Sequence, residues 1–271
     1  MLTPHFIRLF VHGNCLAENF KGEMIPQGIG VTFALYILPW YTLYLVINNY
    51  YPNDLVEIGS MLIMITALYT ASLLGFIDDI LGSRDALGLK GHIKALLSGR
   101  LTTGIIKAAG VLIISLIASI FLSFGFWTIL INTLLTALFT NLLNMLDLRP
   151  GRAIKFYIFL TLIFGINALL TGKYYSFILI LPLIGSVIGY FPFDLKARCM
   201  MGDAGSNLLG ISAGILSIIQ FGYYGKLILL FLLIIIHAIT EKHSLSDVIK
   251  HSRLLSFFDN LGRECKDDQL L

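Results

Sequence analysis

The chain has 271 residues, of which 57% are hydrophobic and 13% are charged, and its mean hydropathy is +0.84. Soluble domains carry about 25% charged residues, so this composition excludes an ordinary soluble domain and indicates a lipid bilayer as the surroundings. The formal net charge is only +3, and no basic run alternates with aromatic residues, so we expect no nucleic-acid partner.

Long apolar runs predict an all-α polytopic membrane protein, because a helix needs about 20 apolar residues to cross a hydrocarbon core of about 30 Å. Residues 2–12 are apolar but too short to span and carry no signal-peptide cleavage site, so we interpret them as a short or truncated first helix. Eight later runs are long enough, and residues 1–271 are therefore predicted to form one membrane domain of about eight to nine helices. The runs are residues 28–51, 55–77, 101–122, 126–146, 154–172, 174–192, 205–222 and 224–240.

Residues 244–263 combine charged residues with apolar residues at helical spacing. This pattern predicts an amphipathic helix that lies in the membrane interface, where it could guide a lipid substrate. A helix packed on the bundle is the alternative. We expect residues 264–271 to form a frayed tail.

Lysine and arginine residues predict the orientation of the chain. With these spans, fifteen of the nineteen fall on one face of the membrane and two, Lys173 and Lys226, fall on the other. Arg8 and Lys107 lie inside apolar stretches and stay unassigned. Because positively charged loops favour the cytoplasm, the richer face is predicted to be cytoplasmic. Four polar clusters of the chain also lie on this face, which indicates a single site at one mouth of the bundle.

The first polar cluster is the adjacent pair Asp78 and Asp79, where the second run ends. Neighbouring carboxylates repel each other, and acids at the C-terminal end of a helix oppose its dipole. A divalent cation would remove this cost, since Mg²⁺ is commonly held by one or two carboxylates together with substrate phosphates. The alternative is a pair of solvated acids. Fifteen residues further on, Lys94 is either a phosphate ligand or ordinary cytoplasmic charge.

A stripe of polar residues ends the fourth run. Asn141, Asn144 and Asp147 recur every three residues and so lie along one helical face. Polar side chains at membrane depth are costly unless they face the interior of the bundle, so the stripe is a candidate to bind a sugar, a base or the water ligands of a metal. The alternative is hydrogen bonding between helices.

The sequence Met-Gly-Asp-Ala-Gly-Ser, at residues 201–206, opens the seventh run. The free N–H groups and the positive dipole end of a helix attract anions, and glycines let the backbone approach a ligand closely. Asp203 is placed to N-cap this helix, and a simple cap is the competing interpretation of the segment.

In their order and on their common face, these clusters resemble the motifs of the polyprenyl-phosphate N-acetylhexosamine-1-phosphate transferase family, whose members start bacterial cell-envelope glycans. The resemblance covers most of the chain, from Asn19 to about Arg263. Asp78 and Asp79 match the family's acidic pair, and Lys94 matches its lysine. Asn141, Asn144 and Asp147 match its Asn-x-x-Asn-x-x-Asp motif, and residues 201–206 match its Met-Gly-Asp-x-Gly-Ser motif.

The resemblance implies phosphoglycosyl transfer at the cytoplasmic leaflet of a bacterial plasma membrane. A polyprenyl phosphate would attack the β-phosphorus of a UDP-sugar, such as a UDP-N-acetylhexosamine, and yield polyprenyl-diphospho-sugar and UMP. The family's aspartate that binds Mg²⁺ matches Asp203. Lys94 would pair with phosphate oxygens, and either Asp78 or Asp79 would orient or deprotonate the lipid phosphate. The nucleotide side would be held by Asn141, Asn144 and Asp147.

The chain departs from the family pattern at three places. Arg149 and Arg152 follow the third motif, where the family usually has a glycine, and they form either an added diphosphate clamp or a basic turn. Translocase I of the family has a histidine-rich loop near its end. This chain has only Lys242 and His243 there, which argues against a muramoyl-pentapeptide substrate, and these two residues are kept as candidate substrate-binding residues. Met200 replaces an aromatic residue on which that enzyme stacks uracil, although methionine sulfur can still pack on a base.

Two non-enzymatic functions compete with this interpretation. A catalytically degenerate member would bind lipid-linked glycan precursors without turnover. A transporter would need buried charges near the bilayer midplane, and the sequence offers few besides Lys107 and His237 and no inverted repeat. The sequence leaves open the sugar, the polymer and whether the chain forms a homodimer.

Overall fold

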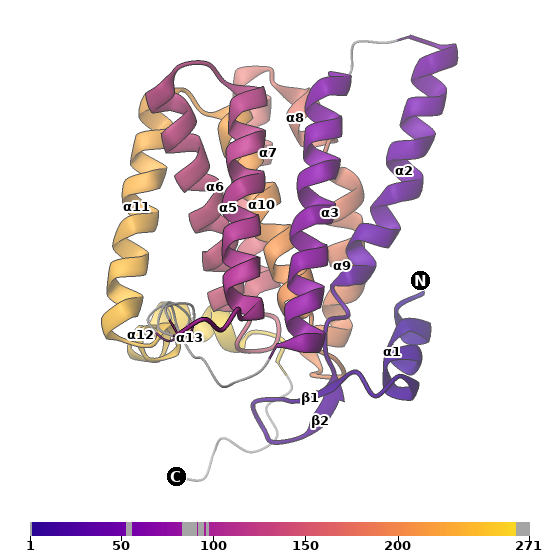
Figure 1. The fold of residues 1–271 in the computed structure, drawn as a ribbon, viewed down its shortest axis with the longest axis vertical. Coiled ribbons are helices and arrows are strands. Elements are labelled where there is room, and N and C mark those ends of the chain that lie inside the picture. Colours follow the sequence, from indigo (N-terminus) through magenta and orange to yellow (C-terminus); the bar gives the residue numbers. More distant parts are fainter. Residues whose placement is uncertain (1, 53–55, 83–90, 92–94, 96–97, 264–271) are drawn as a thin grey trace.

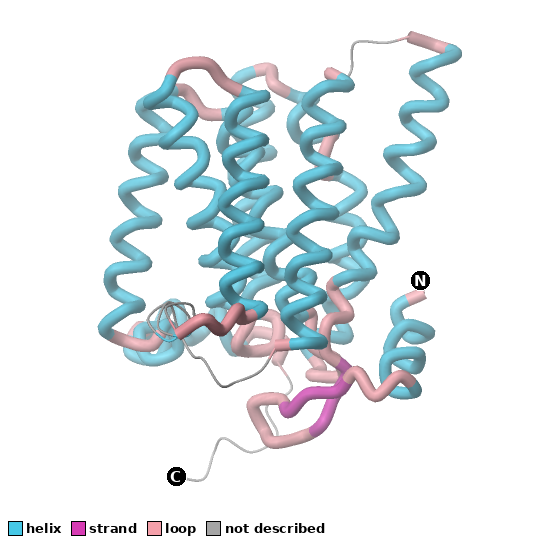
Figure 2. The backbone as a smooth tube through the Cα atoms, viewed as in Figure 1, coloured by secondary structure: helices cyan, strands magenta, loops and turns pink. Residues whose placement is uncertain are grey.

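The computed structural model describes residues 2–52, 56–82, 91, 95 and 98–263, which form a bundle of long helices with a small β-hairpin at one end (Figures 1 and 2). Among these residues, eight helical stretches are long and apolar enough to cross a membrane, which confirms the predicted number. They are α2 (Val31–Tyr50), α3 (Ile58–Leu81), α5 (Thr103–Leu122), α6 (Phe126–Leu146), α7 (Arg152–Thr171), α8 with α9 (Tyr174–Ile178 and Leu181–Leu195), α10 (Gly202–Gln220) and α11 (Tyr223–Lys242).

Apart from α8, the shorter elements gather at one end of the bundle (Figure 1). Asp78, Asp147 and Asp203 lie at this same end, which we call the motif end. The hairpin is antiparallel and pairs Ala17 with Ile25. The elements are α1 (Thr3–His12), β1 (Leu16–Glu18), β2 (Met24–Pro26), α12 (Leu245–His251) and α13 (Arg253–Asn260).

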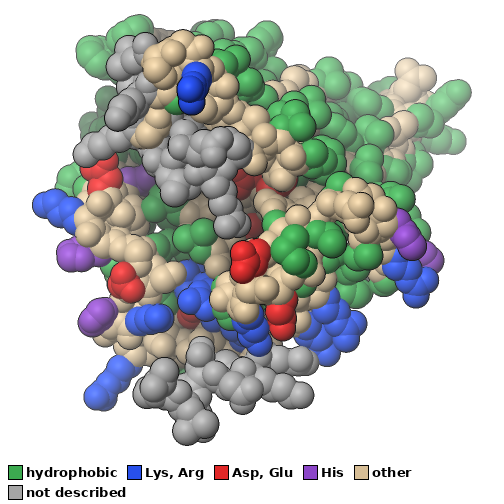
Figure 3. All heavy atoms as spheres, turned by 60° about the horizontal axis from the view of Figure 1, so that its bottom comes forward, with side chains coloured by type: hydrophobic (Ala, Val, Ile, Leu, Met, Phe, Trp, Pro, Cys, Tyr) green, Lys and Arg blue, Asp and Glu red, His purple; other side chains and the backbone are tan. Residues whose placement is uncertain are grey.

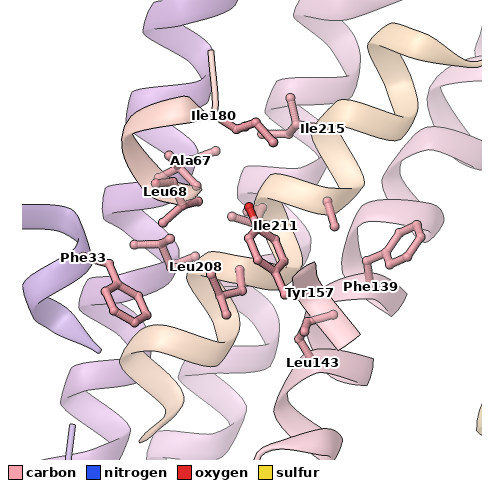
Figure 4. Close-up of a cluster of buried hydrophobic side chains, with 14 of the residues drawn as sticks. Phe33, Ala67, Leu68, Phe139, Leu143, Tyr157, Ile180, Leu208, Ile211 and Ile215 are labelled. Atoms are coloured by element: carbon pink, nitrogen blue, oxygen red, sulfur yellow. The ribbon is translucent and has the colours of Figure 1, made fainter. Parts of the chain in front are cut away.

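Helix α10 forms the centre of the bundle. Nearly all of its residues are buried, and it packs most extensively on α6 and α3. Its side chains Leu208, Ile211 and Ile215 lie in the main hydrophobic core, among residues of several other helices (Figure 4). Small residues permit this close packing, since a Cβ added at Gly210 or Gly214 would overlap α6. The helix that carries the Met-Gly-Asp segment is therefore the most deeply buried of the membrane-spanning helices that the structure describes.

The sixth predicted run is a broken helix. It consists of α8 and α9, with the interruption at Leu179 and Ile180. Pro182 explains the break, because proline has no N–H to donate and its ring crowds the preceding turn. The Tyr41 hydroxyl of α2 donates a hydrogen bond of 2.6 Å to the Leu179 carbonyl. This contact satisfies a backbone acceptor that water could not reach inside a membrane.

The C-terminal segment differs from the single helix expected over residues 244–263. It contains two short helices, α12 and α13, that meet at Ser252. The Ser252 hydroxyl accepts a hydrogen bond from the Leu255 N–H at 3.4 Å, so this serine caps α13 and starts a new helix. The amphipathic character is present in α13, where Leu254, Phe257 and other large apolar side chains are exposed.

The N-terminal helix α1 is too short to span a membrane, as the sequence predicts. It lies beside the motif end and buries Phe10, whose ring centroid is 6.1 Å from that of Phe76 in α3. The hairpin that follows was not predicted. Asn19 shapes its turn, because the side-chain oxygen accepts hydrogen bonds from the N–H groups of Lys21 (2.8 Å) and Glu23 (3.0 Å).

Candidate active site

An acid from α3 holds the N-terminal end of α10. The Asp79 carboxylate accepts hydrogen bonds from the backbone N–H groups of Asp203 (2.9 Å) and Ala204 (3.0 Å), and from Nε2 of Gln27 (2.9 Å). It thereby satisfies free N–H groups of α10 and lies at the positive end of the helix dipole. The expectation that Asp203 caps α10 is wrong. Asp203 lies in the first turn of that helix, and its carboxylate turns to a different partner.

That partner is a lysine that Asp203 shares with Asp78. Lys107 lies one turn into α5, and its Nζ donates to Oδ2 of Asp78 at 2.5 Å and to Oδ2 of Asp203. The three side chains are 16–23% exposed, so the cluster is largely enclosed yet reachable from outside. A cation near the N-terminal end of α5 opposes that helix's dipole. The two carboxylates therefore account for the position of Lys107, and one cation serves two acids.

Glycines bring the surrounding backbones into contact. Gly30, in the loop before α2, touches Gly205 of α10, and a Cβ at Gly30 would overlap that backbone. Gly75 of α3 lies equally close to the backbone of Asp203. Gly202 has a φ of +72°, which few other residues adopt, and its α-carbon faces the Asp79 carboxylate. These glycines shape the acidic cluster by allowing α3, α10 and the first loop to meet.

The third-motif aspartate joins this cluster. Asp147 caps the end of α6 and is half-buried. Burial is the main cause that raises the pKa of Asp147 well above its usual range, and the nearby carboxylates of Asp194, Asp203 and Asp79 add to the effect. A hydrogen bond from the Gly202 backbone acts in the opposite direction. Asp79, Asp147 and Asp203 thus lie within electrostatic reach of one another, at the ends of three different helices.

The two asparagines of the stripe lie on α6 near this cluster. Asn141 is exposed, and its Nδ2 lies 3.5 Å from Sδ of Met145. Asn144 is half-buried, one turn closer to Asp147. The two asparagines thus precede the third-motif aspartate on the same helix, Asn144 by three residues and Asn141 by six, and their roles stay predictions.

A small cavity of about 40 Å³ lies beside Asp147. Residues of the first loop, the turn after α6 and the segment before α10 line it, including Phe20, Arg149 and Met200. The Arg149 guanidinium lies 4.8 Å from the centroid of the Phe20 ring, a cation–π contact. Arg149 and Met200 therefore lie next to the third motif, in the same cavity lining as Asp147.

Arg152 has different surroundings. Its Nε and Nη2 donate to the two carboxylate oxygens of Asp259 in α13, at 2.8 and 2.9 Å, and its Nη1 donates to the Ser246 hydroxyl at 3.0 Å. The side chain is buried, and each nitrogen of the guanidinium has a partner inside the protein. This geometry favours a structural role for Arg152, which attaches the C-terminal helices to the start of α7.

The remaining predicted residues lie further out or outside the described chain. Lys242 and His243 are exposed where α11 ends, at the edge of the bundle in Figure 1. Lys94 lies outside the described residues, so its assignment stays a prediction. Charged side chains gather over the motif end as a whole (Figure 3).

The donor set of the cluster fits Mg²⁺. Asp78 and Asp203 offer carboxylate oxygens that already share one cation, and hard oxygen donors are the ligands that Mg²⁺ prefers. Within the described residues, no group of three or more His, Cys, Asp or Glu side chains is arranged to hold a metal. A bound Mg²⁺ would therefore need ligands from the substrate or from water, as is usual for this ion.

Sequence reasoning missed three residues of this site. The sequence shows Lys107 as a charged residue inside an apolar run, but it does not show which residues pair with it. Gln27 lies in the first loop, and nothing in the sequence shows that it contacts Asp79. Asp194, a buried acid near the end of α9, accepts a hydrogen bond of 2.7 Å from the Gly151 N–H and so supports the turn that carries Arg149.

Comparison of the sequence with known proteins identifies its family. Residues 60–221, more than half of the chain, match the model of glycosyl transferase family 4. The chain belongs to this family. Its members transfer a phospho-sugar to polyprenyl phosphate, so the expected family and the general class of transferase are confirmed.

Relatives of the chain include three phospho-N-acetylmuramoyl-pentapeptide-transferases. The chain is 25% identical to that of Streptococcus pyogenes serotype M4 over 228 residues, which are 79% of this chain and 67% of the relative. It is 27% identical to that of Streptococcus pneumoniae serotype 19F over 216 residues (76% and 65%). It is 30% identical to that of Desulforamulus reducens over 169 residues (58% and 49%). The matched segment thus spans about two thirds of the length of the streptococcal relatives.

Proposed function

We propose that this chain transfers a sugar-1-phosphate from a UDP-sugar to a polyprenyl phosphate at the cytoplasmic leaflet, with release of UMP. The sugar we propose is an N-acetylhexosamine. Membership in glycosyl transferase family 4 supports the reaction class. The observation that carries the proposal is the shared contact of Lys107 with Asp78 and Asp203 at the N-terminal end of α10.

The proposed reaction needs two anions to be positioned and their charge to be neutralised. An oxygen of the lipid phosphate attacks the β-phosphorus of the UDP-sugar, and the bond from that phosphorus to the bridging oxygen breaks, so that UMP leaves with this oxygen. The Lys107 ammonium is placed to bind phosphate oxygens as a point charge. When bound at Asp203, Mg²⁺ would supply Lewis acidity and a template for the diphosphate.

The two adjacent acids have distinct proposed roles. Asp79 uses both of its oxygens on N–H groups inside the protein, so we assign it to positioning Asp203 and the start of α10. Within the described residues, the Asp78 carboxylate makes no such hydrogen bond to a backbone N–H, and it accepts a hydrogen bond from Lys107. We therefore propose Asp78, and not Asp79, as the acid that orients the lipid phosphate or accepts its proton. The asparagine stripe and Asp147 would hold the nucleotide, beside the cavity that Arg149 and Met200 line.

The orientation rests on the distribution of positive charge. Fifteen lysine and arginine residues belong to the face of the motif end by sequence, against two on the other face. Positively charged loops are retained in the cytoplasm. We therefore propose a multi-pass protein of the bacterial plasma membrane with its active site toward the cytoplasm.

The test is a direct assay of the purified protein. It is incubated with Mg²⁺, undecaprenyl phosphate and one member of a panel of UDP-sugars, and UMP and lipid-linked sugar are measured. We expect equal amounts of both products with a UDP-N-acetylhexosamine, and none when Mg²⁺ is removed by EDTA. A protein that binds the lipid but releases no UMP with any sugar would be a degenerate binder, and the proposal would be wrong.

A further inference from the structure

The acidic cluster at the motif end already contains its own cation. Lys107 Nζ lies within hydrogen-bonding distance of one oxygen from Asp78 and one from Asp203. A divalent ion held by these two carboxylates would have to occupy the same small region between them. The ammonium and such an ion therefore compete for one position.

We propose that Lys107 is an internal counter-cation that closes the Asp78–Asp203 pair to divalent cations until a diphosphate is bound. When the diphosphate arrives, the ammonium moves onto its oxygens and releases the carboxylates to the metal. The inference rests on the proposed function only for the presence of a diphosphate in the site. It makes metal binding and nucleotide binding mutually dependent.

The side chain of Lys107 is suited to this exchange. Lysine is a compact charge on a flexible four-carbon stem, so its ammonium can move by a few ångströms without a change in the backbone. The start of α5 is held by a cap of its own, because the Thr102 hydroxyl, five residues before Lys107, accepts a hydrogen bond of 3.4 Å from the Ile105 N–H. The cluster is also partly open, since all three side chains keep some exposure.

The balance of charge explains why the metal ion and the diphosphate would have to bind together. Without Lys107, two carboxylates would face each other unpaired, with Asp79 close behind them, and this arrangement attracts any cation. With Lys107, a metal ion must displace an ammonium group whose acidic partners, within the described residues, are Asp78 and Asp203. The oxygens of a diphosphate would give the ammonium new partners. Linkage then requires each ligand to increase the affinity of the protein for the other by the same factor.

The experiment measures metal binding directly. Mn²⁺ replaces Mg²⁺, and its binding to the purified protein is followed by electron paramagnetic resonance, with and without UDP and with UMP as a single-phosphate control. We expect UDP to tighten Mn²⁺ binding to the wild type about tenfold beyond the binding of Mn²⁺ to UDP in solution, and UMP to have a much smaller effect. The Kd of UDP should fall by the same factor in saturating Mn²⁺.

Two substitutions test the role of the lysine. Lys107→Gln should bind Mn²⁺ about tenfold more tightly than the wild type without nucleotide, and UDP should add little. Lys107→Arg keeps the charge and should stay close to the wild type. The inference is wrong if folded Lys107→Gln binds Mn²⁺ no more tightly than the wild type. It is equally wrong if the wild type binds Mn²⁺ with the same Kd with and without UDP, a measurement that does not depend on any variant folding.

These outcomes are separate from those of the turnover assay. A protein that shows the metal–nucleotide coupling but releases no UMP from any UDP-sugar contradicts the proposed function and supports this inference. A protein that turns over a UDP-sugar without the coupling contradicts this inference alone.

Discussion

Two ion-pair clusters at the motif end differ in how completely their charges are paired. At the cluster of Lys107 with Asp78 and Asp203, one cation serves two acids. At the second cluster, Arg152 and Arg263 both bind the single acid Asp259, and Arg152 does so through two hydrogen bonds. The first cluster has one more acid than cation, and a metal ion could bind there only in place of the Lys107 ammonium, whereas in the second cluster both oxygens of Asp259 are saturated by guanidinium donors.

The two clusters are built from the same types of charged residue but are suited to different roles, one to function and the other to structure. A saturated cluster of planar guanidinium groups fixes geometry, and here it attaches α13 to the start of α7. An unsaturated cluster with a flexible lysine can change its partners. Substitutions in the two clusters should therefore have opposite consequences: a loss of activity with little loss of stability in one, and the reverse in the other.

The largest expected effect is that of Asp203→Asn on turnover. The substitution keeps the shape of the side chain but removes the charge that faces Lys107 and the proposed metal. We expect UMP release to fall about 1,000-fold, as when a preorganised electrostatic group is lost from an active site. The thermal midpoint Tm should stay near that of the wild type. Near-normal UMP release from a folded Asp203→Asn protein would remove Asp203 from the proposed site.

The second prediction is the opposite result for Asp259→Asn. Its partner Arg152 is buried and would lose its counter-charge, which costs about 3 kcal/mol in comparable buried pairs. We expect a clearly lower Tm in detergent, followed by tryptophan fluorescence, with normal turnover per folded molecule. Asp247→Asn, an exposed acid of α12, is the matched control and should change Tm little. A stable Asp259→Asn protein would show that the cluster does not hold α13.

The third prediction concerns how the stability provided by Asp259 depends on pH. Burial alone would raise the pKa of Asp259, but the hydrogen bonds and charges of Arg152 and Arg263 outweigh it and hold this pKa below its usual range. A lowered pKa in the folded state gives stability that is present above the unfolded-state value, about 3.9, and lost as the pH falls through the folded-state value. The Tm difference between wild type and Asp259→Asn should therefore be equal at pH 7 and pH 5 and shrink only below about pH 4. A difference that already closes between pH 7 and pH 5 would contradict this assignment.

Much of the fold follows from the sequence, because spans and their ends depend on local hydrophobicity. The eight helices and the position of the motifs at helix ends required no knowledge of packing. The site itself depends on which faces of the helices meet. Lys107 reads as an isolated charge in an apolar run until α5 is placed beside α3 and α10, as Figure 1 shows. In the same way, a sequence pattern shows that Asp203 could cap its own helix, but not that Asp79 from another helix does so.

The break at Ser252 gives the last and smallest prediction. Because α13 starts anew at its serine cap and Asp259 is turned toward Arg152, the large apolar side chains of α13 point away from the protein: Leu254, Leu255, Phe257 and Phe258 are 46–66% exposed. The interface of a membrane is the environment that suits such a helix. In a background with Trp40 and Trp127 replaced by Phe, the fluorescence of a Phe257→Trp variant should be quenched by lipids brominated near the headgroup when the protein is in liposomes. Asn260→Trp in the same background, at an exposed polar position of the same helix, serves as the comparison and should be quenched less. Equal, weak quenching at both positions would place α13 in water, and the exposed apolar side chains would then need a protein partner to cover them.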